Sequence, residues 1–95
     1  MFIVSLTYTA PLSDVDALLT AHAAWLKQAY ADGLFLASGR KVPRDGGVIL
    51  ARGERAALEA RLAQDPFAKG GVARYDIIEF APSMVAPGLE SLQRA

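Results

Sequence analysis

The chain contains 95 residues, of which 53% are hydrophobic, and its ten basic and ten acidic side chains give a formal net charge of zero. The absence of cysteine excludes disulfides, thiolate metal sites and cysteine nucleophiles. A neutral chain also lacks the basic face that binds nucleic acid phosphates or anionic membranes, so we expect neither partner. A domain of this size buries a limited share of its surface, and the apolar excess favours a homodimer.

The N-terminal half predicts one strand and one helix. The segment "MFIVSLTYTAPL" is apolar but lacks the basic start of a signal peptide, and no apolar run approaches the ~20 residues of a membrane span. We therefore expect a cytoplasmic location. Residues 2–8 alternate in polarity, which predicts a strand. A helix is predicted from Ser13 to about Asp32, where Gly33 ends it.

The second half predicts a hairpin, a helix and a last strand. "LFLASG" and "VILAR" flank a turn segment that is rich in proline and glycine, which predicts a β-hairpin. A second helix follows from Gly53 and ends at Asp65, because the residue before Pro66 is pushed out of the helical region. Residues 72–80 predict the last strand.

The order strand, helix, strand, strand, helix, strand predicts an α+β ferredoxin-like fold with a split βαβ arrangement and both helices on one face. The domain is predicted to span residues 1–80, and residues 81–95 are predicted to form a C-terminal tail. The first and last strands carry apolar residues on both sides, so we expect a second subunit to cover the other face of the sheet.

The only histidine of the chain, His22, falls on the apolar stripe of the first predicted helix. That stripe comprises Val15, Leu18, Leu19, His22, Leu26, Ala29 and Tyr30. One interpretation is a core histidine whose nitrogens bond to backbone or hydroxyl groups. The other is a general acid/base, because imidazole titrates near neutral pH; this interpretation requires a carboxylate partner.

The segment "QDPF" offers such a partner in Asp65. Pro66 makes the backbone at the end of the second helix rigid, so that the Asp65 carboxylate is held in a defined direction. The alternative is an ordinary turn, in which Asp before Pro is common. A carboxylate at the C-terminus of a helix is electrostatically unfavourable, which suggests a reason for Asp65 other than stability.

Further polar side chains gather near the predicted hairpin. Ser38 and Gly39 end its first strand, but "ASGRK" is not a G-x-S-x-G elbow, so a substrate hydrogen bond is favoured over a nucleophile. Basic residues follow at Arg40, Lys41, Arg44, Arg52 and Arg55. They form either a solvated edge or a site for an anionic substrate such as a carboxylate or phenolate.

Cofactor motifs are missing from the sequence. One histidine without cysteine does not build a zinc site of the usual kind, and neither a G-x-x-x-x-G-K-[ST] loop nor a G-x-G-x-x-G motif occurs. The strand "GGVILA" lacks the aromatic residues with which the same fold stacks RNA bases. We therefore expect a site without a metal or other cofactor.

The order of His22, "LASG", "DPF" and "GGV" resembles the YciI-like (YCII-related) family over about residues 1–80. The resemblance implies a dimeric α/β-barrel of ferredoxin-like subunits with a His-Asp dyad, here His22 and Asp65. One characterised branch of the family is a dehydrochlorinase that acts on a chlorinated hydroxyhydroquinone, and structural relatives include muconolactone isomerases. Most members have no assigned reaction.

Two positions depart from the family pattern. Many relatives have proline after the Ser-Gly pair, where this chain has Arg40, and many have arginine three residues before the histidine, where this chain has Leu19. If that arginine binds substrate anions in relatives, this chain uses another cation or another substrate.

The resulting hypothesis is a lyase or isomerase in which Asp65 fixes the tautomer of His22, while the other ring nitrogen moves a proton on a small anionic or aromatic substrate. Ser38 would orient the substrate, and Trp25 and Phe67 would exclude water from it. Two alternatives stay open. One is a non-catalytic module that binds a metabolite or serves as an accessory subunit, and the other is a structural dimer with a buried histidine.

Overall fold

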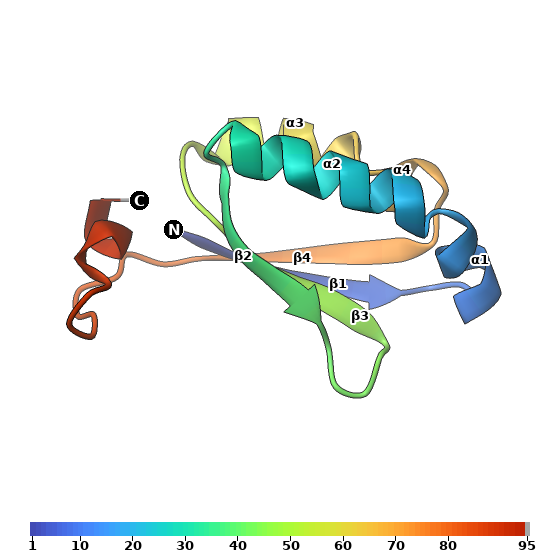
Figure 1. The fold of residues 1–95 in the computed structure, drawn as a ribbon, viewed down its shortest axis with the longest axis horizontal. Helices are drawn as coiled ribbons and strands as arrows, with labels where there is room; N and C mark the ends of the chain where they lie inside the picture. Colours follow the sequence, from blue (N-terminus) through green and yellow to red (C-terminus); the bar gives the residue numbers. More distant parts are fainter. Residues whose placement is uncertain (95) are drawn as a thin grey trace.

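The computed structural model describes residues 1–94 as one antiparallel sheet with helices on one face (Figure 1). The strands are β1 (Phe2–Tyr8), β2 (Phe35–Arg40), β3 (Gly46–Ala51) and β4 (Ala73–Glu79). The helices are α1 (Leu12–Ala17), α2 (Leu19–Ala31), α3 (Arg55–Ala63), α4 (Pro66–Lys69) and the 3-10 helix η1 (Glu90–Arg94). The strand order β2-β3-β1-β4 confirms the predicted ferredoxin-like fold.

Strand β1 lies in the middle of the sheet and supplies much of the core. It pairs with β3 on one side and with β4 on the other, in both cases antiparallel. Its residues alternate in burial, so that Phe2, Val4 and Leu6 are buried under the helices. Leu58 and Leu62 of α3 pack into the same core. The period-2 pattern of β1 therefore determines which face of the sheet the helices cover.

The opposite face of the sheet keeps large apolar side chains at the surface. Ile78 is 58% exposed, and Val48 and Phe80 are 40% and 38% exposed. Apolar surface of this kind is typical of protein interfaces. The predicted homodimer remains a prediction.

The first predicted helix is in fact two helices, because the chain breaks at Leu18. Leu18 ends α1 and precedes α2 with φ −104° and ψ 0°, and its side chain packs so closely on Gly70 that a Cβ there would lie 2.5 Å from Leu18 Cδ1. The predicted apolar stripe is only partly buried. Val15 and Ala29 are buried, whereas Leu19 is 44% exposed because it borders a cavity instead of the core.

The second predicted helix ends earlier than its pattern suggests. Helix α3 ends at Ala63, and a separate helical turn, α4, starts at Pro66. Asp65 is the N-cap of α4, and its side chain accepts a hydrogen bond from the backbone N–H of Phe67. Asp65 follows the C-terminal end of α3, as predicted, but it is also the N-cap of α4, so its carboxylate has a structural role that the sequence analysis did not predict.

The chain continues past β4 to η1, at the end of the molecule where the N-terminus also lies (Figure 1). The predicted tail, residues 81–95, is described as far as Arg94, and its separation from the domain stays a prediction. Within the described residues, no helix has the length and apolar character needed to cross a membrane.

Candidate active site

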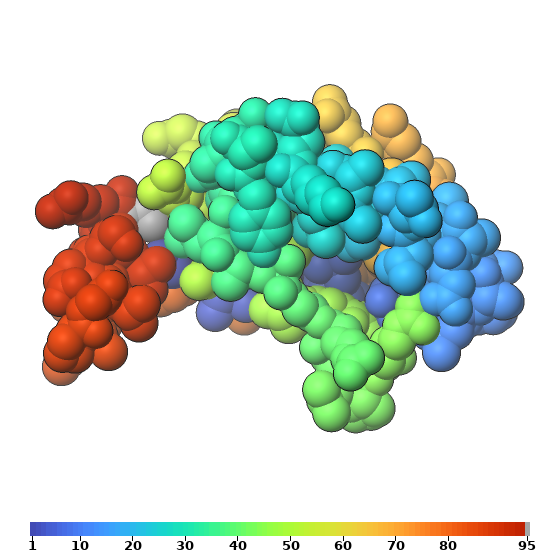
Figure 2. All heavy atoms as spheres, in the orientation of Figure 1, coloured from blue at the N-terminus to red at the C-terminus, as the bar shows by residue number. Residues whose placement is uncertain are grey.

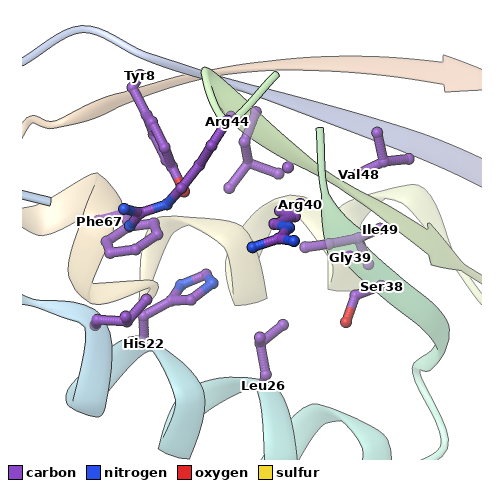
Figure 3. A pocket seen from close by; sticks show the side chains of 14 residues that line it. Tyr8, His22, Leu26, Ser38, Gly39, Arg40, Arg44, Val48, Ile49 and Phe67 are labelled. Atoms are coloured by element: carbon purple, nitrogen blue, oxygen red, sulfur yellow. The ribbon is translucent and has the colours of Figure 1, made fainter. Parts of the chain in front are cut away.

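A cavity of about 440 Å³ opens between α2 and the hairpin of β2 and β3. The surface is hollowed between these elements (Figure 2), and the side chains that line the hollow come from both sides of it (Figure 3). From α2 come Leu19, His22 and Leu26, and from the sheet come Tyr8, Ser38, Arg40 and Ile49, among others. A volume of this size suits a small organic molecule.

His22 points into this cavity from α2 (Figure 3). On its other side, the ring contacts Asp65, which does not line the cavity. The Nδ1 atom of His22 lies 2.7 Å from Oδ1 of Asp65, although 43 residues separate the two in sequence. The side chain of His22 is 12% exposed, and that of Asp65 is fully buried. The geometry thus combines a buried carboxylate with an imidazole that reaches the cavity.

Three donors converge on the Asp65 carboxylate. Its Oδ1 accepts hydrogen bonds from the His22 ring and from the Phe67 backbone N–H at 3.0 Å, and its Oδ2 accepts one from the Tyr75 hydroxyl at 2.5 Å. Since three donors share two oxygens, the carboxylate acts only as an acceptor. Its position is therefore fixed by α2, α4 and β4 together.

Tyr75 is the site residue that the sequence analysis missed. Burial, followed by the hydrogen bond to Asp65 and the charge of that carboxylate, raises the pKa of the Tyr75 hydroxyl well above its ordinary range. Tyr75 thus stays protonated and donates a hydrogen bond to Asp65. Its inward position follows from the alternation of β4, but the alternation alone gives no partner for the hydroxyl.

Aromatic rings hold the imidazole of His22 in place. The Phe67 ring stacks on it at 3.8 Å between centroids with an interplanar angle of 7°, and the Trp25 ring lies 5.5 Å away. Trp25 does not line the cavity. Its indole N–H donates to the Arg61 carbonyl at 3.1 Å and its ring packs on Phe35, so it supports His22 from behind. Phe67 does line the cavity.

The second ring nitrogen of His22, Nε2, is open to the cavity. It has no hydrogen-bond partner in residues 1–94, and no buried side-chain nitrogen or oxygen there lacks a partner, so Nε2 must be accessible. The Asp65 carboxylate requires a proton on Nδ1, which leaves Nε2 with a free lone pair in the neutral ring. The arrangement can therefore accept and return a proton at Nε2.

Ser38 and Gly39 lie across the cavity from α2, on β2. The Ser38 hydroxyl accepts a hydrogen bond from the Tyr30 hydroxyl at 2.7 Å. Its own proton is then available to a molecule in the cavity. Gly39 contributes backbone to the wall.

The five basic residues near the hairpin do not form one cluster. Arg44 pairs with Asp16 at 2.6 Å, and Arg55 pairs with Glu59 at 3.0 Å. Arg52 donates to a backbone carbonyl, and Lys41 donates to a threonine hydroxyl. Arg40 and Arg44 line the cavity. Across residues 1–94, no three His, Cys, Asp or Glu side chains lie close enough together to share a metal ion.

One similar solved structure is 5-chloro-2-hydroxyhydroquinone dehydrochlorinase (TftG) from Burkholderia phenoliruptrix AC1100, in complex with 2,5-dihydroxybenzoquinone. The match has a TM-score of 0.68 and 16% sequence identity, and it covers 84% of this chain and 93% of that chain. At this identity the match shows a shared fold. The comparison with curated proteins gives no match.

A family model identifies the family of this chain, which the similarity to the solved structure does not. The model of the YCII-related domain matches residues 1–81, which include His22, the Ser-Gly pair of β2 and the capping Asp65. This match confirms the resemblance that those motifs indicate. The chain belongs to the family of proteins with a YCII-related domain.

Proposed function

We propose that this protein is a cofactor-free enzyme of the lyase or isomerase type, in which His22 and Asp65 perform general acid/base chemistry on a small molecule. One observation carries the proposal. The His22 ring is bound through Nδ1 to a buried carboxylate and presents Nε2 to a cavity of about 440 Å³. An imidazole held in this way suits proton transfer near neutral pH.

In the proposed reaction, Nε2 takes a proton from a C–H or O–H group of the substrate. The positive charge that develops on the imidazole is stabilised by the Asp65 carboxylate, 2.7 Å from Nδ1. The same nitrogen then returns the proton to another atom of the substrate, or to a leaving group. Tyr75 and the Phe67 backbone N–H act as positioning groups, because they hold the carboxylate and not the substrate.

The cavity suits a flat, oxygenated ring. Tyr8, His22 and Phe67 line it with aromatic surface, and Ser38 offers a hydroxyl. The structurally similar dehydrochlorinase was solved with 2,5-dihydroxybenzoquinone. Hydroxylated quinones and chlorinated hydroxyhydroquinones are therefore the first candidate substrates.

The test is a turnover screen of these compounds, followed by chloride release and product absorbance, with the wild type and His22→Gln. General acid/base catalysis typically contributes about 10²- to 10⁴-fold, so His22→Gln should lower kcat by that factor. Lys27→Ala, on the exposed side of α2, is the matched control and should leave kcat unchanged. Turnover that survives in His22→Gln contradicts the proposal, and a metabolite that binds without conversion favours a binding module instead.

We further propose that the protein is a homodimer that buries the second face of the sheet. Ile78, Val48 and Phe80 supply exposed apolar surface there. Ile78→Glu should shift the mass measured by sedimentation equilibrium from two chains to one, because the new charge would be buried at the interface. Ala60→Glu, which adds the same charge at an exposed position of α3, is the control and should keep the mass of two chains. A monomeric wild type contradicts the proposal.

A further inference from the structure

The geometry points to Arg40 as the anion-binding residue of the cavity, and so to a planar organic anion as the substrate class. This inference rests on the proposed function for the role of His22. It also makes a separate claim about binding, which can be tested without turnover.

The charges that line the cavity are of one sign. Arg40 and Arg44 are the charged side chains in its wall, and no carboxylate of residues 1–94 lines it. Asp65 is fully buried behind His22 and does not reach the cavity. The formal net charge of the whole chain is zero, so the positive wall is a local feature and favours a negative ligand.

The two arginines differ in how their charge is balanced. Arg44 forms an ion pair with Asp16 at 2.6 Å, and its guanidinium carbon lies 5.8 Å from the centre of the Tyr8 ring. The guanidinium of Arg40 has no carboxylate within 4 Å and no hydrogen-bond partner in the described part of the chain. Arg40 is therefore the cation that is available to a ligand.

The strand geometry directs Arg40 into the cavity (Figure 3). Ser38 and Arg40 are two residues apart on β2, so both side chains lie on the same face of the sheet. The residue opposite Arg40 on β3 is Gly47, which has no side chain to fill the space. A hydroxyl and a guanidinium thus face the same side of the cavity.

This arrangement specifies the ligand more closely than charge alone does. A guanidinium binds two adjacent oxygens of a carboxylate, enolate or phenolate pair through two parallel hydrogen bonds. The rings of Tyr8 and Phe67 favour a flat body, and Nε2 of His22 needs an exchangeable proton on the substrate. The substrate class is therefore a planar organic anion with adjacent oxygens at Arg40 and an acidic proton at His22.

The test compares two probes by isothermal titration calorimetry at neutral pH. 2,5-Dihydroxybenzoquinone is anionic under these conditions, and hydroquinone is neutral with a similar shape. The wild type should bind the anion more tightly than hydroquinone. Arg40→Gln should weaken binding of the anion by about 10- to 100-fold, the effect of one charge-assisted contact, and leave hydroquinone binding nearly unchanged.

Three further variants sharpen the result. Arg40→Lys keeps the positive charge but lacks the two parallel N–H donors of the guanidinium, and should lose part of the affinity for the anion. Arg55→Gln on α3 removes an exposed arginine that does not line the cavity, and should bind both probes as the wild type does. Leu19 lines the same cavity from α2, so Leu19→Arg combined with Arg40→Gln should restore part of the affinity for the anion.

Two results would overturn the inference. One is a wild type that binds the anion no more tightly than hydroquinone, and the other is Arg40→Gln with wild-type affinity for the anion. His22→Gln separates this inference from the proposed function, since it should keep the anion affinity and lose turnover. If Arg40→Gln loses anion binding while His22→Gln keeps full turnover, the anion site at Arg40 is supported and the catalytic role of His22 is contradicted.

Discussion

Tyr75 donates a hydrogen bond to the Asp65 oxygen that does not face His22, with 2.5 Å between the two oxygens. The carboxylate is thereby held from β4 as well as from α2. A carboxylate fixed on both sides keeps the imidazole in one orientation, which a catalytic base requires. The dyad is in this sense a chain of three side chains, Tyr75, Asp65 and His22.

Removal of the Tyr75 hydroxyl should destabilise the protein. In Tyr75→Phe, Oδ2 of the fully buried Asp65 loses its only partner among the described residues, which costs about 1–3 kcal/mol of unfolding free energy. Urea unfolding measures this loss. Tyr30→Phe is the matched control, because the Tyr30 hydroxyl bonds to Ser38 at the surface, and its loss should cost less than about 0.5 kcal/mol. Equal losses in both variants would contradict the buried role of Tyr75.

Stability should also fall with alkaline pH because of Tyr75. The pKa of this hydroxyl is raised in the folded protein, whereas in the unfolded chain it titrates at about 10. Its stabilising contribution is therefore complete below about pH 10 and is lost as the pH rises further. The unfolding free energy of the wild type should fall more steeply than that of Tyr75→Phe, by up to about 1.4 kcal/mol per pH unit. Parallel curves between pH 9 and 11 would contradict this assignment.

The floor of the cavity depends on a glycine that permits close contact between strands. A Cβ on Gly46 would lie within 1.8 Å of the Leu6 carbonyl oxygen, so Gly46→Ala must push β3 away from β1. We expect a loss of about 3 kcal/mol or more in unfolding free energy. Gly39→Ala is the control, because nothing lies within 4 Å of its added Cβ, and it should change stability by less than about 1 kcal/mol. Thermal unfolding of both variants gives the comparison.

Asp65 should matter to the stability of the fold, whatever its part in the proposed catalysis. Asp65→Ala removes the N-cap of α4 and leaves three donors without their acceptor, so we expect a loss of about 3 kcal/mol. Glu59→Ala removes an exposed carboxylate on α3 that pairs with Arg55 at 3.0 Å, and should cost less than about 1 kcal/mol. If the denaturant midpoints of Asp65→Ala and of the control Glu59→Ala shift equally, the hydrogen bonds to Asp65 do not stabilise the fold.

Local sequence patterns predict the element order, and through it the strand order of the sheet. The strands can be predicted because their signals are local. These signals are the alternation in residues 2–8 and 73–79 and the turn before Gly46. The break between α1 and α2 at Leu18 cannot be predicted from local sequence patterns. It accompanies packing of Leu18 on Gly70, and that contact joins segments 52 residues apart.

The site is predictable in its residue types but not in its contacts. His22 stands out because it is the only histidine and lies on an apolar stripe, and Asp65 stands out because the proline after it makes the end of the second predicted helix rigid. Tyr75 does not stand out, since a tyrosine is ordinary in a strand and its partner comes from another element. The ion pair of Arg44 could not be predicted for the same reason, because its partner Asp16 lies on α1. The pair of Arg55 and Glu59 differs, since the two residues are one turn apart in α3 and their spacing is visible in the sequence.

The central claim is that Asp65 holds the proton of neutral His22 on Nδ1 and leaves Nε2 free in the cavity. The most direct test is the tautomer of this single histidine, read from its ring ¹⁵N shifts in the wild type at a pH where the ring is neutral, and in Asp65→Asn. We predict a protonated Nδ1 and an unprotonated Nε2 in the wild type, and loss of that preference in Asp65→Asn. A proton on Nε2 in the wild type, or the same tautomer in both proteins, would contradict the account.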